Sequence, residues 1–599
     1  MLSPCTILKM YWRTFVLVLS PILVAILPIV SATDESKCGY VMIMMAILWM
    51  TEALPLAVTA LIPVFAFPVL GILPTGDVTR VYMKENIMMF IGGVTMAVAV
   101  EHCNLHKRIA LFVILHLGQS PRRLMAGFML TTMFLSMWIS NTATTAMMVR
   151  VVDALLIELF TSSDKIEETV IPNGDFVVIS NVQAPLELQG IENGGYVLDS
   201  DCECEVTKSG PIKCQRGKKE DKDQSRPKTI ADMTLSDDCK ALKDMCFLAV
   251  AYSANIGGTG SMTGTGSNLV LKGILASTFG ESTGLNFASW MAFNVPGMIL
   301  CVVCAWVWLQ VLFMGLCRKG GQSIQKTTPE KEAALKKILS DQYKELGPIT
   351  HQEKTVLFLF IVVVLLWLFR SPEFIPGWSD LFTDSNGKKL AIKDASSVIL
   401  VIFLLFALPA NLSFLKNIRS KEGPILPPAP GCLTWKVVQE KIPWGIVLLM
   451  GGGLALAEGC KKSGLSIWLG QQLVVFNAMP KLVTVFLICL LIAMLTEVAS
   501  NTATASIFLP VLKEMAVNVN VNPLYLMLPA TICCSYAFML PVATPPNAIV
   551  YAAADMKSSD MMKAGIVMNI LCVIIITVMI NTLGVLMFDL YNMPDWALS

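Results

Sequence analysis

The sequence predicts an all-α polytopic membrane protein made of two inverted-topology repeats, with about 11 transmembrane helices and two re-entrant hairpins. Hydrophobic residues make up 55% of the 599 and charged residues only 15%, which excludes a soluble enzyme of ordinary composition. The segment Ser-Asn-Thr-Ala-Thr at 140–144 recurs at 500–504, a shift of 360 residues. A Gly-Gly pair at 92–93 returns at 451–452, a shift of 359. The two halves therefore share one plan.

Eleven apolar segments come close to or exceed the roughly 20 residues that a helix needs to cross the hydrocarbon core. The first follows Lys9 and Arg13 and could be read as a signal peptide, but no small-residue cleavage site follows it, which favours a first span. We predict spans at 12–31, 38–53, 54–73, 86–103, 246–277, 291–316, 354–370, 397–414, 442–460, 522–552 and 562–588.

Two further apolar stretches, 123–160 and 481–515, each carry Ser-Asn-Thr near the middle and polar or charged residues at both ends. A hairpin that enters and leaves the membrane on one side places this polar motif at its tip. The alternative is a pair of ordinary spanning helices, which would leave the motif as a mid-helix polar stretch without a purpose. We therefore predict two re-entrant hairpins.

Basic clusters predict the orientation, because cytoplasmic loops are enriched in Lys and Arg. They place the N-terminus in the cytoplasm and the C-terminus outside, so that the first hairpin opens from the cytoplasm and the second from outside, as expected of inverted repeats. The clusters are Lys107, Arg108, Arg122 and Arg123; Arg318, Lys319, Lys336 and Lys337; and Lys416, Arg419 and Lys421.

Two polar segments lie between the apolar ones. The segment 161–245 alternates acidic and basic residues and is predicted to be a cytoplasmic insertion, largely disordered. The segment 328–345 has apolar residues at helical spacing and is predicted to be a helix along the inner membrane surface.

Glycine and proline interrupt two of the predicted spans. The stretch 257–268 contains five glycines, and Pro541, Pro545 and Pro546 lie at the matching place in the second half. A continuous helix is not stable there, so we expect each span to unwind. Unwound carbonyl oxygens suit a hard cation such as sodium, and the free N–H groups of a restarting half-helix suit an anion. Such paired interruptions predict the binding site of a transporter.

The two hairpin tips add neutral donors and acceptors from Ser, Asn and Thr. Because the tips are related by inversion, each could take one end of a substrate with two separated carboxylates. Neutral donors also permit release, whereas an arginine pair would hold a dicarboxylate too strongly at low dielectric. The alternative is that these side chains only bridge helices. Their duplication beside glycine-broken helices favours binding.

Two charged residues depart from the symmetry of the hairpins. Glu497 matches Met137 at the shift of 360 residues. An intramembrane carboxylate is a candidate functional group, and proton coupling is one hypothesis for it. Arg150 matches Pro510, and snorkelling or pairing with Asp153 would accommodate its charge.

These motifs resemble the divalent anion/sodium symporter family, whose signature is the doubled Ser-Asn-Thr. The resemblance covers nearly the whole chain and is strongest for the animal di- and tricarboxylate branch, and within it for the invertebrate "I'm not dead yet" transporters. Other matching segments are Trp49–Pro55, Asn104–Arg108, Phe134–Trp138 and Leu540–Asn547.

The resemblance implies a homodimer in which each protomer has a scaffold and a transport domain that moves as an elevator. Arg150, in place of proline, and Gly266-Ser267, where the second repeat has Pro545-Pro546, depart from the pattern. The implied sodium ligands are Ser136, Ser140, Asn141 and Gly264 at one site and Thr496, Ala499, Asn501 and Ala543 at the other. The implied substrate ligands are Ser140, Asn141, Thr142, Thr265, Ser500, Asn501, Thr502, Thr544 and Pro545.

This division predicts seven segments along the chain. They are first-repeat scaffold helices at 1–122; the first re-entrant hairpin at 123–160; the insertion at 161–245; the first broken helix at 246–277; scaffold helices, the interfacial helix and the start of the second repeat at 278–480; the second hairpin at 481–515; and the second broken helix with the last transmembrane helix at 516–599.

The resemblance implies a multi-pass plasma-membrane transporter, and not an enzyme, that imports succinate, citrate and similar carboxylates together with Na+. No organic cofactor is expected, and the net charge of +1 gives no reason to expect a nucleic-acid partner. The intact second Ser-Asn-Thr favours sodium coupling over sodium-independent carboxylate exchange, and sodium-sulfate cotransport is a third interpretation. A channel fits paired inverted hairpins poorly.

Overall fold

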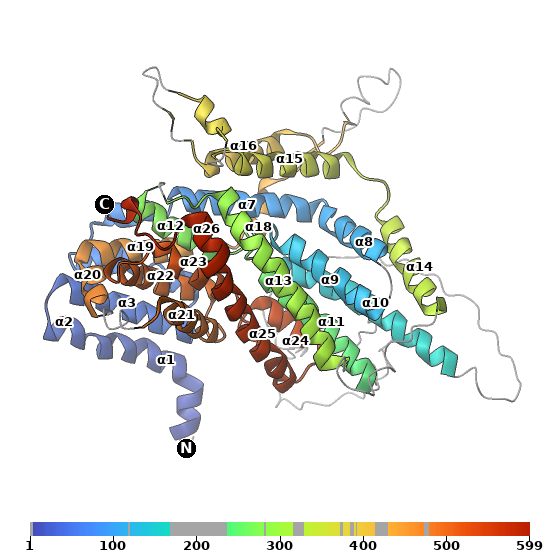
Figure 1. Cartoon of the computed structure of the whole chain (residues 1–599), viewed down its shortest axis with the longest axis horizontal. Coiled ribbons are helices and arrows are strands. Elements are labelled where there is room, and N and C mark those ends of the chain that lie inside the picture. Colours follow the sequence, from blue (N-terminus) through green and yellow to red (C-terminus); the bar gives the residue numbers. More distant parts are fainter. Residues whose placement is uncertain are drawn as a thin grey trace, which may run out of the picture.

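The computed structural model describes most of the chain, and within the described residues every regular element is helical (Figure 1). Two isolated β-bridges, Thr383 with Lys389 and Pro409 with Gly431, are the β-structure of this part. The prediction of an all-α chain is therefore confirmed. The described residues are 4–117, 120–167, 237–280, 283–314, 329–371, 375–383, 389–390, 392–413, 429–472 and 479–598.

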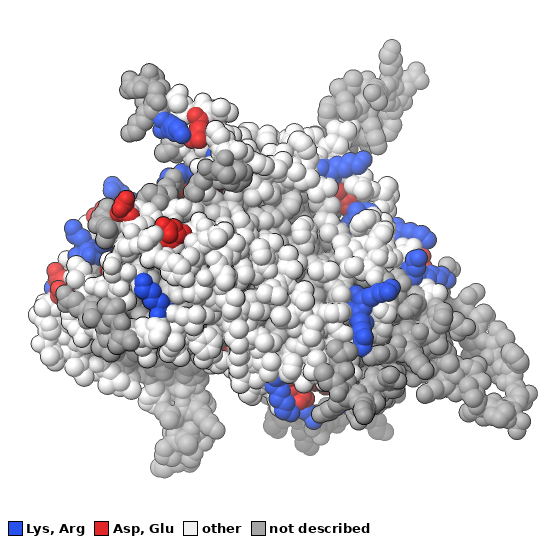
Figure 2. Space-filling model, in the orientation of Figure 1, with Lys and Arg blue, Asp and Glu red and all other residues white. Residues whose placement is uncertain are grey.

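Six helices of the described part are long and apolar enough to cross a membrane, and four shorter ones are also apolar, so the chain is a multi-span membrane protein. Most charged side chains on the face in Figure 2 lie towards its edges, around a broad uncharged area. The number of crossings, about 11, stays a prediction. The six are Met10–Val30, Thr75–His102, Phe287–Phe313, His351–Leu368, Trp444–Ser463 and Ser558–Phe588.

The first half of the chain contains twelve described helices, and the first predicted break falls between the last two of them. They are α1 (Pro4–Val24), α2 (Ile26–Val30), α3 (Asp34–Thr51), α4 (Leu56–Thr59), α5 (Ile62–Val69), α6 (Thr75–Val81), α7 (Glu85–His102), α8 (Leu105–Leu117), α9 (Pro121–Ser136), α10 (Asn141–Glu167), α11 (Asp237–Gly257) and α12 (Gly266–Phe279). Helices therefore occupy both ends of the predicted 161–245 insertion, and its middle, 168–236, lies outside the described residues.

The second half has the same kinds of elements and a helix at the predicted 328–345 segment. They are α13 (Phe287–Phe313), α14 (Pro329–Glu345), α15 (His351–Leu368), the 3-10 turn η4 (Trp378–Leu381), α16 (Asp394–Ala407), α18 (Trp435–Lys441), α19 (Trp444–Ser463), α20 (Leu465–Gln472), α21 (Lys481–Leu495), α22 (Asn501–Asn518), α23 (Pro523–Cys533), α24 (Pro545–Ala554), α25 (Ser558–Met579), the π-turn η6 (Ile580–Gly584), α26 (Val585–Phe588) and α27 (Asp595–Leu598).

Capping side chains explain several boundaries. The Asn286 side chain accepts from the Ser289 N–H at 2.8 Å, and the Ser289 hydroxyl accepts from the Asn286 N–H at 2.9 Å, so α13 begins at Phe287. Two matching positions end helices of the two repeats: Asn104 (φ 59°) follows α7 and Gly464 (φ 80°) follows α19. Both use the left-handed conformation that stops a helix.

Helices of the two repeats pack against each other at the centre of the molecule. Helix α7 packs along α15 and α16, and α13 packs between α11 and α25 (Figure 1). Each helix that starts at a Ser-Asn-Thr motif packs against the restarting half of the other repeat's broken helix, so α10 contacts α24 and α22 contacts α12. This exchange brings both motifs and both breaks towards one region.

Candidate functional site

Both Ser-Asn-Thr motifs lie where one helix ends and the next begins. Helix α9 ends at Ser136 and α10 begins at Asn141, and α21 ends at Leu495 and α22 begins at Asn501. The Ser140 hydroxyl accepts from the Ala143 N–H at 3.3 Å. The first N–H groups of a helix have no partner within it, so each motif presents donors at the positive end of a helix dipole.

Both predicted breaks are present. In the first, α11 stops at Gly257 and α12 restarts at Gly266; in the second, α23 stops at Cys533 and α24 restarts at Pro545. Thr265 and Thr544 occupy the N-cap positions of the two restarting helices, both in extended conformation. Most of the unwound chain is buried in protein at both places, as backbone away from helices must be within a membrane, although Val542 in the second break is exposed.

One asparagine per break holds the unwound chain, and the two are arranged alike. The Asn268 amide donates to the carbonyl oxygens of Gly258 at 3.1 Å and Ser261 at 2.9 Å. Asn547 donates to Ala537 at 3.0 Å and to Leu540 at 2.9 Å. In each case the acceptors lie ten and seven residues before the asparagine, so the duplicated plan extends to single hydrogen bonds.

A hydroxyl links each tip to the broken helix of its own repeat. The Ser136 Oγ lies 2.6 Å from Asn141 Oδ1 and 2.8 Å from the Ala254 carbonyl oxygen. The Thr496 Oγ1 lies 2.9 Å from Asn501 Oδ1 and 2.8 Å from the Cys534 carbonyl oxygen. A hydroxyl carries one proton and donates to one acceptor at a time, so each group of three oxygens has spare lone pairs. Such buried oxygen groups suit a hard cation.

The first predicted sodium ligands come together in the structure. A Cβ on Gly258 would lie 2.8 Å from Asn141 Oδ1, which places the first tip against the first break. Gly264 packs on the carbonyl group of Gly258 in the same break. Ser136 and Asn141 are in contact with each other, and Ser140 is the adjoining residue that precedes α10.

The second predicted set is only partly joined by contacts. Thr496 and Asn501 are in contact, and Ala499 is buried in the turn between them. Ala543 lies in the second break, where its N–H donates to the Leu540 carbonyl oxygen at 3.2 Å. That the residues of the two sets bind sodium stays a prediction.

Contacts between the repeats join the predicted substrate residues. A Cβ on Gly266 would lie 2.6 Å from Thr502 Oγ1, so the first restarting helix touches the second tip. The Asn255 amide donates to Thr544 Oγ1 at 3.2 Å and to Asn547 Oδ1 at 3.2 Å. Ser140–Thr142 and Pro545 start the two packed helices α10 and α24, whereas Thr265 Oγ1 contacts Ser267 Oγ at 2.7 Å.

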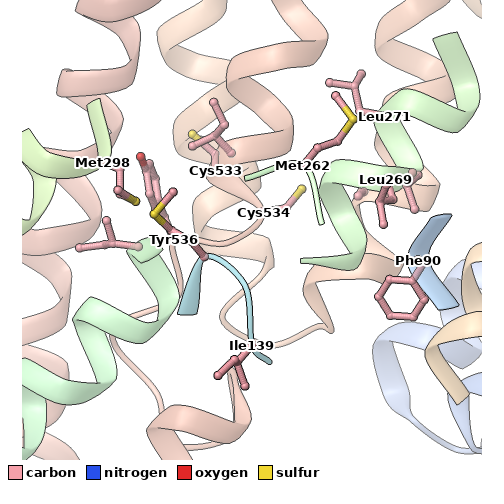
Figure 3. Close-up of a cluster of buried hydrophobic side chains, with 14 of the residues drawn as sticks. Phe90, Ile139, Met262, Leu269, Leu271, Met298, Cys533, Cys534 and Tyr536 are labelled. Carbon is pink, nitrogen blue, oxygen red and sulfur yellow. The ribbon is translucent and has the colours of Figure 1, made fainter. Parts of the chain in front are cut away.

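Sequence reasoning did not single out Asn255, Asn268 or Asn547 as residues that hydrogen-bond to the unwound segments. All three are buried amides in apolar segments. A polar residue in such a segment is the signal that could have marked them as functional. Buried apolar side chains surround this region and lower its dielectric. Figure 3 shows Met262 and Leu269 from the first broken helix and Cys533, Cys534 and Tyr536 from the second.

Glu497 fastens the second break. Its carboxylate accepts from the backbone N–H of Phe538 at 2.8 Å, of Met539 at 3.0 Å and of Leu540 at 3.0 Å. It also accepts from Asn569 Nδ2 at 2.7 Å, and the residue is 3% exposed. The sequence identified the residue but not this role.

A cavity of about 600 Å³ opens beside the first tip. Ile139, Ala143 and Thr144 line it near the motif, and Arg150 and Lys107 line it together with other polar and apolar side chains. The cavity therefore lies between the first motif and the start of α8, where it is lined by His106 and Lys107.

Known proteins are similar to this chain over almost its whole length. A family model described as "Sodium:sulfate symporter transmembrane region" matches residues 8–590. "Solute carrier family 13 member 2" of Oryctolagus cuniculus is 42% identical over 601 residues, covering 99% of this chain and 95% of that protein. "Na(+)/citrate cotransporter" of Mus musculus is 40% identical, covering 98% and 96%. "Na(+)/dicarboxylate cotransporter 3" of Rattus norvegicus is 38% identical, covering 98% and 94%.

Proposed function

The chain belongs to the sodium:sulfate symporter family, and on that premise we propose that it cotransports sodium with di- and tricarboxylates such as succinate and citrate. Relatives named for citrate and for dicarboxylate match almost its whole length. The observation that carries the proposal is the duplicated group of oxygens, in which Ser136 meets Asn141 and Thr496 meets Asn501 beside the two breaks.

We assign the two carboxylates of the substrate to the two tips. The N–H groups that start α10 and α22 and the hydroxyls of Ser140, Thr142, Ser500 and Thr502 supply neutral donors. The restarting helices add Thr265, Thr544 and the N-terminal end at Pro545. Hydrogen bonds to a charged acceptor contribute about 1.5–3 kcal/mol each, so a few of them bind a dianion while still releasing it.

We assign one Na+ to each oxygen group. The first uses the side chains of Ser136 and Asn141, with Ser140 and backbone around Gly264. The second uses Thr496 and Asn501, with backbone at Ala499 and Ala543. If sodium binds first, it would fix the conformation of the two tips and so complete the anion site. Each asparagine belongs both to an oxygen group that binds sodium and to a tip that binds the anion.

Transport requires the site to face each side of the membrane in turn, and we propose an elevator movement of the hairpins and broken helices against a scaffold within a plasma-membrane homodimer. The N-terminus would be cytoplasmic and the C-terminus extracellular. Helix α12 meets α16 through a salt bridge between Lys272 and the buried Asp394, which Arg370 Nε also approaches at 2.6 Å. Separating a buried ion pair without new partners for its charges costs free energy. The pair would therefore favour discrete positions of the moving helices against the scaffold.

Uptake of radiolabelled succinate, with external sodium present or replaced by choline, tests the proposal. We expect uptake to collapse in choline and to be inhibited by citrate and not by sulfate. Sodium-independent uptake that internal carboxylate accelerates would indicate an exchanger. Uptake inhibited by sulfate at least as well as by citrate would indicate a sulfate cotransporter.

A further inference from the structure

Three basic side chains, Lys107, Arg150 and Lys441, are among the residues that line the cavity beside the first tip. It is bounded by the end of α7, the start of α8, helix α10 and parts of α14 and α18. Its volume of about 600 Å³ is in the range of ligand-sized pockets. Thr144, whose buried hydroxyl has no hydrogen-bond partner among the described residues, belongs to the wall nearest the tip.

Two of the cavity's charged groups neutralise each other. Glu101 Oε1 lies 2.6 Å from Lys441 Nζ. His106 is buried, with Nδ1 3.3 Å from the Val100 carbonyl oxygen, and burial lowers its pKa so that it is neutral at physiological pH. His102 at the end of α7 completes the histidines of the cavity.

Lys107 and Arg150 supply the remaining positive charge. Both line the cavity and both are exposed. In the part of the chain that the structure describes, neither has an ion-pair partner. Arg150 lies on α10, the helix that starts at the first tip, and Lys107 lies on α8. The two unpaired cations therefore border the same opening from different helices.

The second repeat has no such charges at the matching positions. At the shift of 360 residues Lys107 matches Ile467, which is 61% exposed, and Arg150 matches Pro510, which is buried. The register is reliable there, because Asn104 and Gly464 end matching helices at the same shift. The basic cavity therefore belongs to one face of the molecule.

We propose that Arg150 and Lys107 form a second, weak anion site in this cavity, which holds a di- or tricarboxylate between the first tip and the membrane face on which the cavity opens. This inference rests on the proposed function. Arginine binds a carboxylate through two parallel hydrogen bonds, and lysine adds a point charge for a second carboxylate. Exposure of both side chains keeps the site weak, and their field concentrates anions near the tip. By the basic-cluster orientation this face is cytoplasmic.

Transport kinetics measured from the two faces test the site. Arg150→Gln and Lys107→Gln are compared with wild type and with the matched control Arg123→Gln, an exposed arginine on α9 away from the cavity lining. Succinate uptake into cells reports one face, and efflux from preloaded cells reports the other. Surface expression of each variant is measured in parallel.

We expect Arg150→Gln and Lys107→Gln each to raise the half-saturating succinate concentration at the cavity face about fivefold, the factor for roughly 1 kcal/mol from one partly solvated ion pair. The opposite face and Arg123→Gln should be unchanged, and Arg150→Lys should restore part of the loss. The site would be overturned if one or both Gln variants left the half-saturating succinate concentration at the cavity face unchanged, or if it changed equally at both faces. Either result would leave the proposed function intact. A wild-type protein that moves no succinate would overturn both.

Discussion

The two unwound segments have the same pattern of asparagine hydrogen bonds, but different side chains make their other contacts. Asn268 and Asn547 hold them through carbonyl oxygens at the same spacing. Beyond that, the second segment is bound by the carboxylate of Glu497, whereas the first is held by neutral bonds: the Ser261 hydroxyl donates to the Met137 carbonyl oxygen, and Trp290 Nε1 donates to Thr259. Both repeats therefore have the same group of three oxygens beside the break, whereas the contacts that hold each unwound segment differ.

The difference has an energetic meaning. A buried carboxylate is costly unless hydrogen bonds compensate for lost water. Glu497 accepts from three consecutive backbone N–H groups and one side-chain amide, and no cation pairs with it in the described residues. Its removal would leave several buried donors unsatisfied, whereas the loss of the Ser261 hydroxyl would remove the bond to Met137 and a longer contact, 3.4 Å, with Thr263 Oγ1.

The first way to break the comparison is Glu497→Gln against Ser261→Ala. The glutamine NH2 group would face backbone donors that now meet an oxygen, so we expect Glu497→Gln to lower stability by about 3 kcal/mol and uptake at least tenfold, against about 1 kcal/mol for Ser261→Ala. Thermal unfolding of the purified variants and succinate uptake give the measurement. Equal effects would contradict the comparison. Normal stability with loss of the pH dependence of uptake would instead assign proton coupling to Glu497.

The second prediction tests what the repeats share. Asn141→Ala and Asn501→Ala each remove an oxygen that contacts a buried hydroxyl, which also contacts a carbonyl oxygen of the broken helix. We expect each change to raise the half-saturating sodium concentration about tenfold, for the loss of roughly 1.4 kcal/mol. Sodium-dependence curves of succinate uptake measure it, with Asn411→Ala, far from both tips in the chain, as the control. Unchanged sodium dependence in either variant would mean that its group binds no cation.

The sequence predicted the helical architecture and the positions of both breaks because these follow from local composition. Glycine at 257, 258, 260, 264 and 266 and proline at 541, 545 and 546 destabilise the interior of a continuous helix. The family resemblance, and not the repeat alone, implied which tip residues lie beside a broken helix. Each of these signals lies in the residues themselves.

The fastening of the breaks could not be predicted in the same way. Glu497 binds backbone N–H groups, which nearly every residue carries, so no sequence pattern marks its partners. Asn255 joins the two repeats across 289 residues, to Thr544. The cavity around Arg150 depends on how α8, α10 and α18 pack, although the mismatch with Pro510 did mark the position.

The third prediction concerns the contact between repeats. Gly266 matches Pro545 at the shift of 279 residues, so one repeat has a side chain where the other has none. A Cβ at Gly266 would lie 2.6 Å from Thr502 Oγ1, closer than real contacts allow. We expect Gly266→Ala to reduce maximal uptake about fivefold, since overpacking of about 1 kcal/mol displaces the second tip. Gly76→Ala, where a Cβ meets open space, is the control. Full activity of Gly266→Ala would show that the second tip moves freely against α12.

The smallest effect should come from the tip threonines, and it separates the two faces of the site. Thr142 is exposed beside the cavity, whereas Thr502 is buried against α12. We expect Thr142→Ala to raise the half-saturating succinate concentration about threefold and Thr502→Ala about fivefold, because a buried hydrogen bond to an anion is less screened by water. Thr142→Ser and Thr502→Ser keep the hydroxyl and should behave like wild type. The same dependence on succinate in both alanine variants and wild type would remove the tips from the anion site, and a larger loss for Thr142 would mean that the first tip closes around the substrate more tightly than the second.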